Sequence, residues 1–201
     1  MSTLIAKDTT YNAIQDIQEE NKKLKIRLNR KINGQKQQAY LKNLIGDKIY
    51  YKLLLLGGII LDRDGRVVKF GIWDENGEGY CMLYKYELKK LSFMIKDLRS
   101  LPNLKYINLE CTNIKGNIYD LKSLPKLTGI NLSCTDVTGN IERLKTLPNL
   151  TQISLYCTNV RGKIEHLKTL PNLTQIRLQF TGVTGDKEAF EASRDWEACY
   201  L

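Results

Sequence analysis

The sequence has a single histidine, and this shortage limits the chemistry it can perform. His166 is that residue, and we expect it on the opposite, convex side of the chain from the cysteines Cys111, Cys134 and Cys157. A thiolate metal site usually needs four converging Cys or His ligands, and an activated Ser or Cys nucleophile needs a base beside it. There is also no glycine loop of the kind that cradles phosphates and no acidic pair in a recognisable setting. We therefore expect no enzymatic activity, no metal site and no cofactor.

Long apolar runs are missing as well. The longest extends from Leu53 to Leu61, whereas a membrane-spanning helix needs about 20 apolar residues. Residues 1–10 lack the basic stretch and apolar run of a secretory signal. The cysteines are odd in number and lack the spacing of a disulfide framework. Together these absences predict a cytoplasmic protein with reduced thiols.

Positive charge is concentrated near the N-terminus. Residues 1–56 carry 11 Lys and Arg against 5 Asp and Glu, which is most of the net charge of +9. Such a segment can contact an anionic partner, either nucleic acid or an anionic membrane surface. No aromatic residue lies between Asn21 and Ile32, so stacking on bases is not supported. A solvated helix or a protein contact is the alternative. The candidate contacts are Lys22, Lys23, Lys25, Arg27, Arg30 and Lys31.

A helix is expected from Thr10 to Ile32, because apolar residues recur there every three or four positions. In heptad notation Asn21 is an a position, as asparagine often is where it fixes the register of a two-stranded coil. The seam ends where Lys31 occupies the next d position. The helix could therefore pair with another helix, pack on its own domain or stay solvated. The seam residues are Ile14, Ile17, Asn21, Leu24 and Leu28. We expect Asn33-Gly34 to end this helix, and a second to run from Gln35 to Ile45.

From Leu101 to about Arg194 the sequence repeats every 23 residues. Four copies keep six columns in register, and a fixed period in the 20s indicates a solenoid. The columns are Leu104, Leu127, Leu150 and Leu173; Ile107, Ile130, Ile153 and Ile176; Leu109, Leu132, Leu155 and Leu178; Thr112, Thr135, Thr158 and Thr181; Ile114, Val137, Val160 and Val183; and Gly116, Gly139, Gly162 and Gly185.

This pattern resembles the leucine-rich repeat family, close to its plant-like form. The resemblance implies an α/β fold, in which a horseshoe segment of parallel β-sheet follows the helical N-terminal extension. We expect the Thr column to satisfy backbone groups and the Gly column to adopt positive φ. A column of Cys111, Cys134 and Cys157 is expected to fill space beside the sheet.

Both ends of the array depart from the repeat. Gly58 to Val67 predicts a hairpin with an Asp-Gly turn, similar to the N-terminal cap of plant-type repeats. A degenerate first rung follows, with Val67, Phe70 and Ile72 in the apolar columns, Glu75 at the ladder position and Gly79 at the glycine position. Beyond it we expect an inserted amphipathic helix, with Tyr84, Leu88, Leu91, Ile95 and Leu98 on its apolar side.

At the other end, Trp196, Cys199 and Leu201 continue the columns as a half-rung. Asp186 is the expected N-cap of the preceding helical segment, with Ala189 and Phe190 facing inward. We expect a finished array rather than part of a longer receptor. The predicted domains are a basic extension at 1–47 and a repeat domain at 48–201. The repeat domain divides into the N-terminal cap, first rung and inserted helix (48–100), the regular repeats (101–185) and the C-terminal cap (186–201).

The concave sheet face is the candidate binding site. Its outward positions are polar with little charge, and Tyr and Arg are enriched at protein interfaces. The face lacks the density of Lys and Arg that phosphate binding needs. We expect a non-catalytic scaffold that binds a protein here. The alternatives are a subunit of a larger, possibly ribonucleoprotein, assembly anchored by the basic helix, and an intracellular signalling or immune-type recognition protein. The candidate contacts are Tyr106, Asn108, Glu110, Asn131, Gln152, Ser154, Tyr156, Gln175, Arg177 and Gln179.

Overall fold

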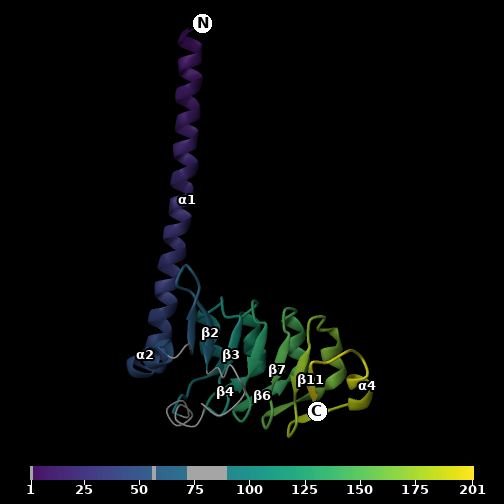
Figure 1. Cartoon of the computed structure of the whole chain (residues 1–201). Coiled ribbons are helices and arrows are strands. Elements are labelled where there is room, and N and C mark those ends of the chain that lie inside the picture. The colour runs from purple at the N-terminus through teal and green to yellow at the C-terminus, as the bar shows by residue number, and fades with distance from the viewer. Residues whose placement is uncertain (1, 56–57, 72–89) are drawn as a thin grey trace.

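The computed structural model shows a long helix rising from one end of a solenoid (Figure 1). It describes residues 2–55, 58–71 and 90–201. The α-helices are α1 (Ser2–Ile45), α2 (Asp47–Leu55) and α4 (Lys187–Glu191). Four 3-10 helices also recur along the chain, namely η1 (Ile95–Ser100), η2 (Ile118–Ser123), η3 (Ile141–Thr146) and η4 (Ile164–Thr169).

The solenoid is built from two sheets. A seven-stranded sheet has the order β1-β2-β3-β5-β7-β9-β11, and a four-stranded sheet has the order β10-β8-β6-β4. The strands of the first are β1 (Ile59–Leu61), β2 (Val67–Gly71), β3 (Tyr106–Asn108), β5 (Gly129–Asn131), β7 (Gln152–Ser154), β9 (Gln175–Arg177) and β11 (Ala198–Tyr200). Those of the second are β4 (Lys115–Asn117), β6 (Asp136–Asn140), β8 (Asn159–Lys163) and β10 (Gly182–Thr184).

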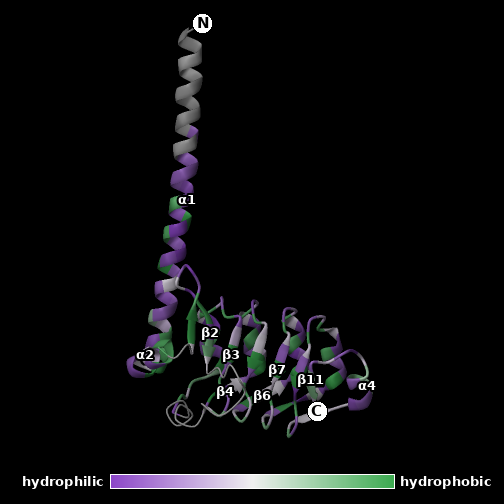
Figure 2. Cartoon of the chain, viewed as in Figure 1, coloured by the Kyte–Doolittle hydropathy of each residue, from purple (hydrophilic) through white to green (hydrophobic). Residues whose placement is uncertain are grey.

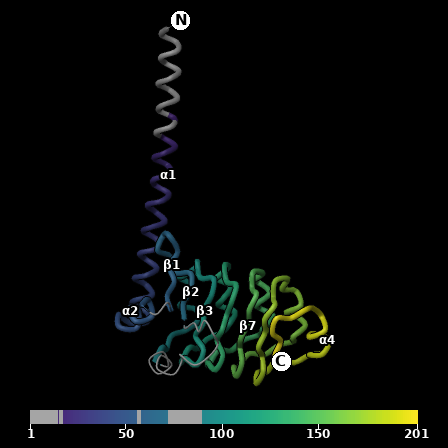
Figure 3. Tube along the Cα trace, viewed as in Figure 1, coloured from purple at the N-terminus to yellow at the C-terminus, as the bar shows by residue number. Residues whose placement is uncertain are grey.

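The register of the larger sheet confirms the 23-residue repeat. Ile107 lies beside Ile130, Ile130 beside Ile153, and Ile153 beside Ile176. The 3-10 helices stack on the opposite, convex side. The apolar columns are buried between the two sides, where they form one continuous core. Each rung therefore buries its apolar side only against its neighbours, as expected of a solenoid. The path of this array is easiest to follow along the Cα trace (Figure 3).

The polar and glycine columns do what the sequence predicts. Each Thr hydroxyl donates to the carbonyl three residues earlier, as Thr158 does to Leu155 over 2.6 Å. Each column glycine has φ between 117° and 124°, a region that L side chains rarely adopt. A Cβ at Gly162 would also meet the side-chain oxygen of Asn140. Both columns thus serve the bend of the chain between the sheets.

The N-terminal cap hairpin is confirmed. Strand β1 pairs antiparallel with β2, and Phe70 lies beside Ile107 as the first rung requires. Ile72, Glu75 and Gly79, which were assigned to the rest of that rung, lie outside the described residues.

The prediction of an inserted amphipathic helix is wrong for those of its residues that the structure describes. Residues 84–89 lie outside the described residues, residues 91–93 are not helical, and Met94 forms a parallel bridge with Lys115. The 3-10 helix η1 follows and begins the convex stack. The apolar residues spaced three and four apart therefore belong to the convex half of the first rung. Its buried residues lie 23 positions before those of the next rung, as in the pairs Leu91 and Ile114, Ile95 and Ile118, and Leu98 and Leu121.

The predicted helix break at Asn33-Gly34 is also wrong. Helix α1 is continuous over 44 residues and ends only at Ile45. The structural reason for Gly34 is close packing, because a Cβ there would lie 2.1 Å from the backbone oxygen of Asp64 in the cap hairpin. Leu41 and Ile45 on the same helix belong to the solenoid core. The domain division at residue 47 stays a prediction, and buried side chains on both sides of it share that core.

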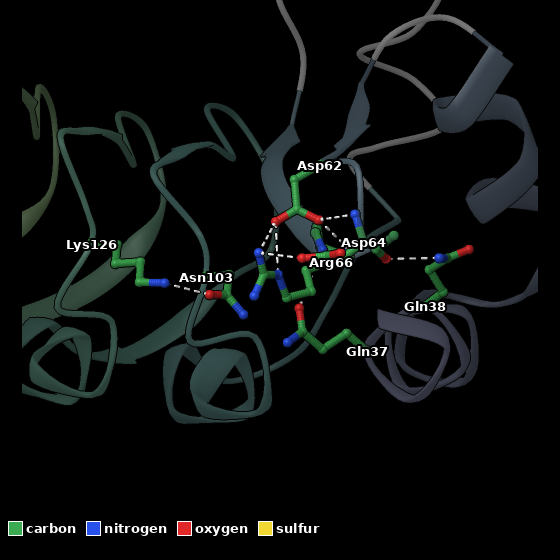
Figure 4. A network of polar contacts seen from close by, with 9 residues as sticks. Gln37, Gln38, Asp62, Asp64, Arg66, Asn103 and Lys126 are labelled. Carbon is green, nitrogen blue, oxygen red and sulfur yellow. Dashed lines mark hydrogen bonds and ion pairs between the residues drawn. The ribbon is translucent and has the colours of Figure 1, made fainter. Parts of the chain in front are cut away.

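A polar network fixes the helix to the hairpin (Figure 4). The Gln37 side chain accepts a hydrogen bond from the backbone of Val67 at 3.2 Å, and Gln38 donates to the carbonyl of Gly65 at 2.7 Å. Inside the hairpin Arg66 forms ion pairs with Asp62 at 2.7 Å and Asp64 at 3.0 Å. Farther along, Tyr40 donates to the carbonyl of Asp97 at 2.7 Å. The helix is therefore anchored at several points from residue 34 onward.

This network predicts a pH dependence of stability. Burial acts against ionisation of Asp62, but hydrogen bonds from Arg66 and Asp64 and the guanidinium charge outweigh it and lower the pKa of this carboxyl. A lowered pKa in the folded state stabilises the fold above the unfolded-state value of about 3.9, and this contribution is lost as the pH falls through the folded value. We expect urea unfolding to show Asp62→Asn less stable than the wild type at neutral pH, with the difference shrinking in acid. A difference that stays constant across that range would contradict the assignment.

The C-terminal half-rung is confirmed, with Cys199 beside Ile176 in the sheet. Asp186 caps α4 by accepting from the backbone of Ala189, and Phe190 is buried. Ala189 itself is exposed, against expectation. Arg194, which stands where earlier repeats have proline, donates to the carbonyls of Leu170, Leu173 and Lys168. It thereby satisfies backbone groups at the exposed end of the last full rung. None of the described helices is both long enough and apolar enough to cross a membrane, and the cytoplasmic location stays a prediction.

Candidate functional site

The residues predicted on the concave face lie together on the side of the seven-stranded sheet that faces away from the core. They form parallel columns, because each strand is one repeat from the next. One column is Asn108, Asn131, Ser154, Arg177 and Tyr200. A second is Tyr106, Gly129, Gln152, Gln175 and Ala198. A third lies just beyond the strands and holds Glu110, Ser133, Tyr156 and Gln179. The sequence therefore located the face correctly, whereas its role in binding stays a proposal.

In the N-terminal half of this face the side chains bind one another. The Asn131 amide donates to Glu110 at 3.1 Å, and the hydroxyls of Ser133 and Ser154 are 2.7 Å apart. The ring of Tyr106 lies over Gly129, where any Cβ would overlap it. Burial raises the pKa of Tyr106. With these polar groups already paired, this half offers a partner few unmet hydrogen bonds.

The C-terminal half is different, because aromatic and cationic side chains stand out from it. The guanidinium of Arg177 lies 4.6 Å from the centre of the Tyr156 ring. The Phe180 ring meets Tyr156 edge to face at 5.3 Å and is 75% exposed. Tyr200 is exposed as well and lies beside Arg177 in the sheet. We name Tyr156, Arg177, Phe180 and Tyr200 the C-terminal cluster.

A shallow groove of about 220 Å³ connects the two halves. Tyr106 bounds one end, Arg177 and Tyr200 the other, and Gln152 and Ser154 line it between them. Near its C-terminal end the Gln175 amide donates to Glu197 at 2.8 Å. The groove runs across the strands and therefore along the solenoid axis. A peptide segment bound in it would lie in that direction.

Two members of the C-terminal cluster were missed at the sequence level. Phe180 follows the last of the predicted outward positions, and Tyr200 lies in the half-rung, whose outward side was not considered. Both could have been found by continuing the columns, since Phe180 stands 23 residues after Cys157 and Tyr200 stands 23 after Arg177.

The cysteine column has an unexpected backbone conformation. Cys111, Cys134 and Cys157 all have φ between 53° and 57°, and so does Phe180 at the fourth repeat. A bulky residue in this region is strained, and such strain is often found at functional sites. Burial, together with the neighbouring thiols, raises the pKa of Cys134 to about 11. This thiol is therefore protonated at neutral pH and a poor nucleophile.

The basic residues proposed for an anionic partner lie on the exposed part of α1. Lys22, Lys23, Lys25, Arg27, Arg30 and Lys31 are all exposed. At about 100° of rotation per residue, Lys22 and Lys31 point to opposite sides of the helix. The charges are thus spread around most of its circumference, which does not favour a single phosphate-binding face. Within the described parts of the chain, no group of three or more His, Cys, Asp and Glu could hold a metal ion.

Comparison with known proteins supports the architecture. No family model matches the sequence, and no curated protein matches it. Among solved structures it is similar to the leucine-rich repeat ectodomain of the receptor kinase SOBIR1 from Arabidopsis thaliana, at 16% identity and a TM-score of 0.54, covering 82% of this chain and 91% of that one. It is also similar to the BIR3–SERK2 complex from Arabidopsis thaliana, at 18% identity and a TM-score of 0.51, covering 71% and 76%.

A third similar structure is an internalin C2 from Listeria monocytogenes, at 21% identity and a TM-score of 0.45. The match covers 53% of this chain and 46% of that one, so this chain spans less than half of the internalin. Identities this low bear on the fold alone. Together with the register of the two sheets, the likeness to the Arabidopsis structures shows that this chain has the leucine-rich repeat fold.

Proposed function

We propose that the chain binds a protein partner through its concave face, with the C-terminal cluster as the anchor. The observation that carries this proposal is the set of contacts that the Arg177 side chain makes. Its cation lies over Tyr156, and none of the described carboxylates forms an ion pair with it. A partner that supplies a carboxylate here gains a charge-assisted hydrogen bond, which is stronger than a neutral one.

The chemistry of the cluster also supports a protein rather than a phosphate ligand. Exposed Tyr and Arg side chains supply a large share of binding energy at protein interfaces, and Phe180 adds apolar area beside them. One guanidinium offers too little positive charge for a phosphate backbone. We expect the partner to present an acidic side chain next to an apolar or aromatic one.

The similar structures agree with this role without identifying the partner. One of them is a complex of two proteins, BIR3 and SERK2. In this chain the polar, groove-bearing face and the C-terminal cluster support binding of the same general kind. The assembly subunit anchored by the basic helix and the signalling or immune-type protein remain alternative predictions.

The test compares two double variants of the full chain as baits in extracts of its own cells. Tyr156→Ala with Arg177→Ala removes a cation–aromatic pair from the concave face. Tyr119→Ala with Arg143→Ala removes a similar pair, 5.4 Å apart, from the convex side. We expect the concave variant to weaken capture of the partner by about thirtyfold or more, as loss of an interface hot spot does.

The convex variant is the control and should retain the same partner within about twofold, because both of its changes lie outside the proposed interface. Circular dichroism of both variants shows whether each is folded. A folded concave variant that captures the partner as well as the wild type would remove the C-terminal cluster from the proposal.

A further inference from the structure

Helix α1 leaves the solenoid and extends well beyond it (Figure 1). Gly34 is the first residue of α1 that is described as buried, and residues 2–33 before it extend over roughly 48 Å at 1.5 Å per residue. Over residues 18–33 polar residues predominate, with a few apolar ones among them (Figure 2). A lone helix in water is stabilised mainly by packing of an apolar face. Residues 18–33 of α1, whose side chains are all exposed, therefore lack this source of stability within a single chain.

Two exposed leucines of the projecting helix, Leu24 and Leu28, lie on the side that faces away from the solenoid. Leu28 is 60% exposed, and Leu24 is exposed one turn earlier. Leu28 and Gln37 are nine residues apart, so they point in opposite directions at about 100° per residue. Since Gln37 faces the cap hairpin, the solenoid cannot cover the Leu28 side. In the sequence Ile17 and Ile14 continue the same stripe toward the N-terminus.

We propose that this stripe pairs with the same stripe of a second copy of the chain, as a short parallel two-stranded coiled coil. Asn21 selects that arrangement. In a parallel pair in register it faces its own counterpart, and the two amides hydrogen-bond each other. In an antiparallel pair it would face an apolar d residue and lose its partner, which costs about 1–3 kcal/mol.

Charge complementarity supports the parallel register. Glu20 precedes the Asn21 a position as a g residue, and Lys25 is the e residue of the following heptad. In a parallel coiled coil the g residue of one helix lies beside this e residue of its partner. Two such pairs, Glu20 to Lys25 in each direction, would then flank Asn21. Within one helix these residues are five apart and do not face each other.

The end of the stripe also agrees with the structure. Lys31 occupies the next d position, where two lysines would repel each other, and the packing on the solenoid begins three residues later at Gly34. The paired segment thus ends where each helix joins its own domain. With the stripe facing away from Gln37, the two solenoids lie on opposite outer sides of the coil and do not compete for the same space.

The first test is analytical ultracentrifugation of the full chain over a range of concentrations. We expect a reversible monomer–dimer equilibrium in the wild type. Leu28→Asp puts a charge in the seam and should weaken the dimer by about a hundredfold, as two buried unpaired carboxylates would. Ile26→Asp is the matched control, because Ile26 is 44% exposed on the same helix but at an f position outside the seam. It should change the dimer affinity by less than about threefold.

The second test exchanges the flanking charges. Glu20→Lys places like charges beside Lys25 of the other copy and should weaken the dimer. Adding Lys25→Glu to the same chain restores opposite charges and should recover most of the lost affinity. A wild-type chain that stays monomeric at all concentrations would overturn the proposal. A dimer that loses equal affinity in Leu28→Asp and Ile26→Asp would show that the contact lies elsewhere, and absence of rescue by the double exchange would overturn the parallel register.

Discussion

Leu155→Ala is expected to lower the free energy of unfolding by about 2–5 kcal/mol, the cost of truncating a fully buried leucine. Leu155 is not exposed at all and lies in the middle of the array, with rungs on both sides. Its backbone N–H donates to the carbonyl of Arg177 in the next rung, and its own carbonyl accepts from Thr158 in the same rung. The cavity would thus be opened where several elements meet.

In a solenoid, this loss of stability extends beyond the rung that carries the substitution. Stability in a repeat array is a sum of rung terms and interface terms between neighbours, and a four-repeat array has few interfaces to spare. We expect one cooperative urea transition, followed by circular dichroism, with a lower midpoint and an unchanged slope.

Leu55→Ala is the control for this prediction. Leu55 is 85% exposed in α2, so the same change of side chain should alter stability by less than about 0.5 kcal/mol. An unfolding midpoint for Leu155→Ala equal to that of Leu55→Ala would contradict the described core.

Gly34→Ala is expected to be destabilising by about 2–4 kcal/mol, although alanine is the better helix former by about 1 kcal/mol. The added Cβ would lie 2.1 Å from the oxygen of Asp64 and 2.7 Å from the carbonyl carbon of Gly65. Both are backbone atoms, which cannot rotate away as a flexible side chain could. The helix or the cap hairpin must therefore move, and the contacts of Gln37 and Gln38 with the hairpin would be strained.

Limited proteolysis distinguishes this effect from a general loss of stability. We expect Gly34→Ala to make the junction between α1 and the solenoid cleavable, while the repeats remain protected. Asn33→Ala is the neighbouring control, because Asn33 is exposed and the change slightly favours the helix. If Gly34→Ala proved as stable and as protected as Asn33→Ala, the close packing at this position would be refuted.

The 23-residue period was sufficient to predict most of the solenoid. Buried leucines, Thr hydroxyls and positive-φ glycines repeat because every rung meets the same neighbours, so one alignment of columns assigns them all. The half-rung at Cys199 was found by the same counting, which works wherever the spacing is kept.

The predictions from sequence were wrong where tertiary packing decides which residue a position needs. Asn33-Gly34 has the composition of a turn, yet Gly34 is needed for its lack of a side chain against the hairpin. Leu91, Ile95 and Leu98 have helical spacing, but the same spacing also fits the convex half of a rung, and periodicity alone does not distinguish the two. At the site, the columns located the face, whereas pairing in its N-terminal half and exposure of Phe180 depend on side-chain packing.

The two proposed surfaces lie at opposite ends of the molecule and would act together. A pair of chains joined through α1 would carry two concave faces, each with its C-terminal cluster remote from the coil. A partner with two binding segments would then bind both faces with raised effective concentration and gain avidity without any new contact.

Site-specific photo-crosslinking in the protein's own cells shows which face of the solenoid meets the partner. A photo-reactive phenylalanine at position 180 takes the place of the exposed Phe180 ring, and the same group at position 119 on the convex side is the control. We expect one dominant crosslinked protein from position 180, and loss of that crosslink when Arg177→Ala is added. A crosslink to the same protein from position 119 with none from position 180 would contradict binding at the concave face.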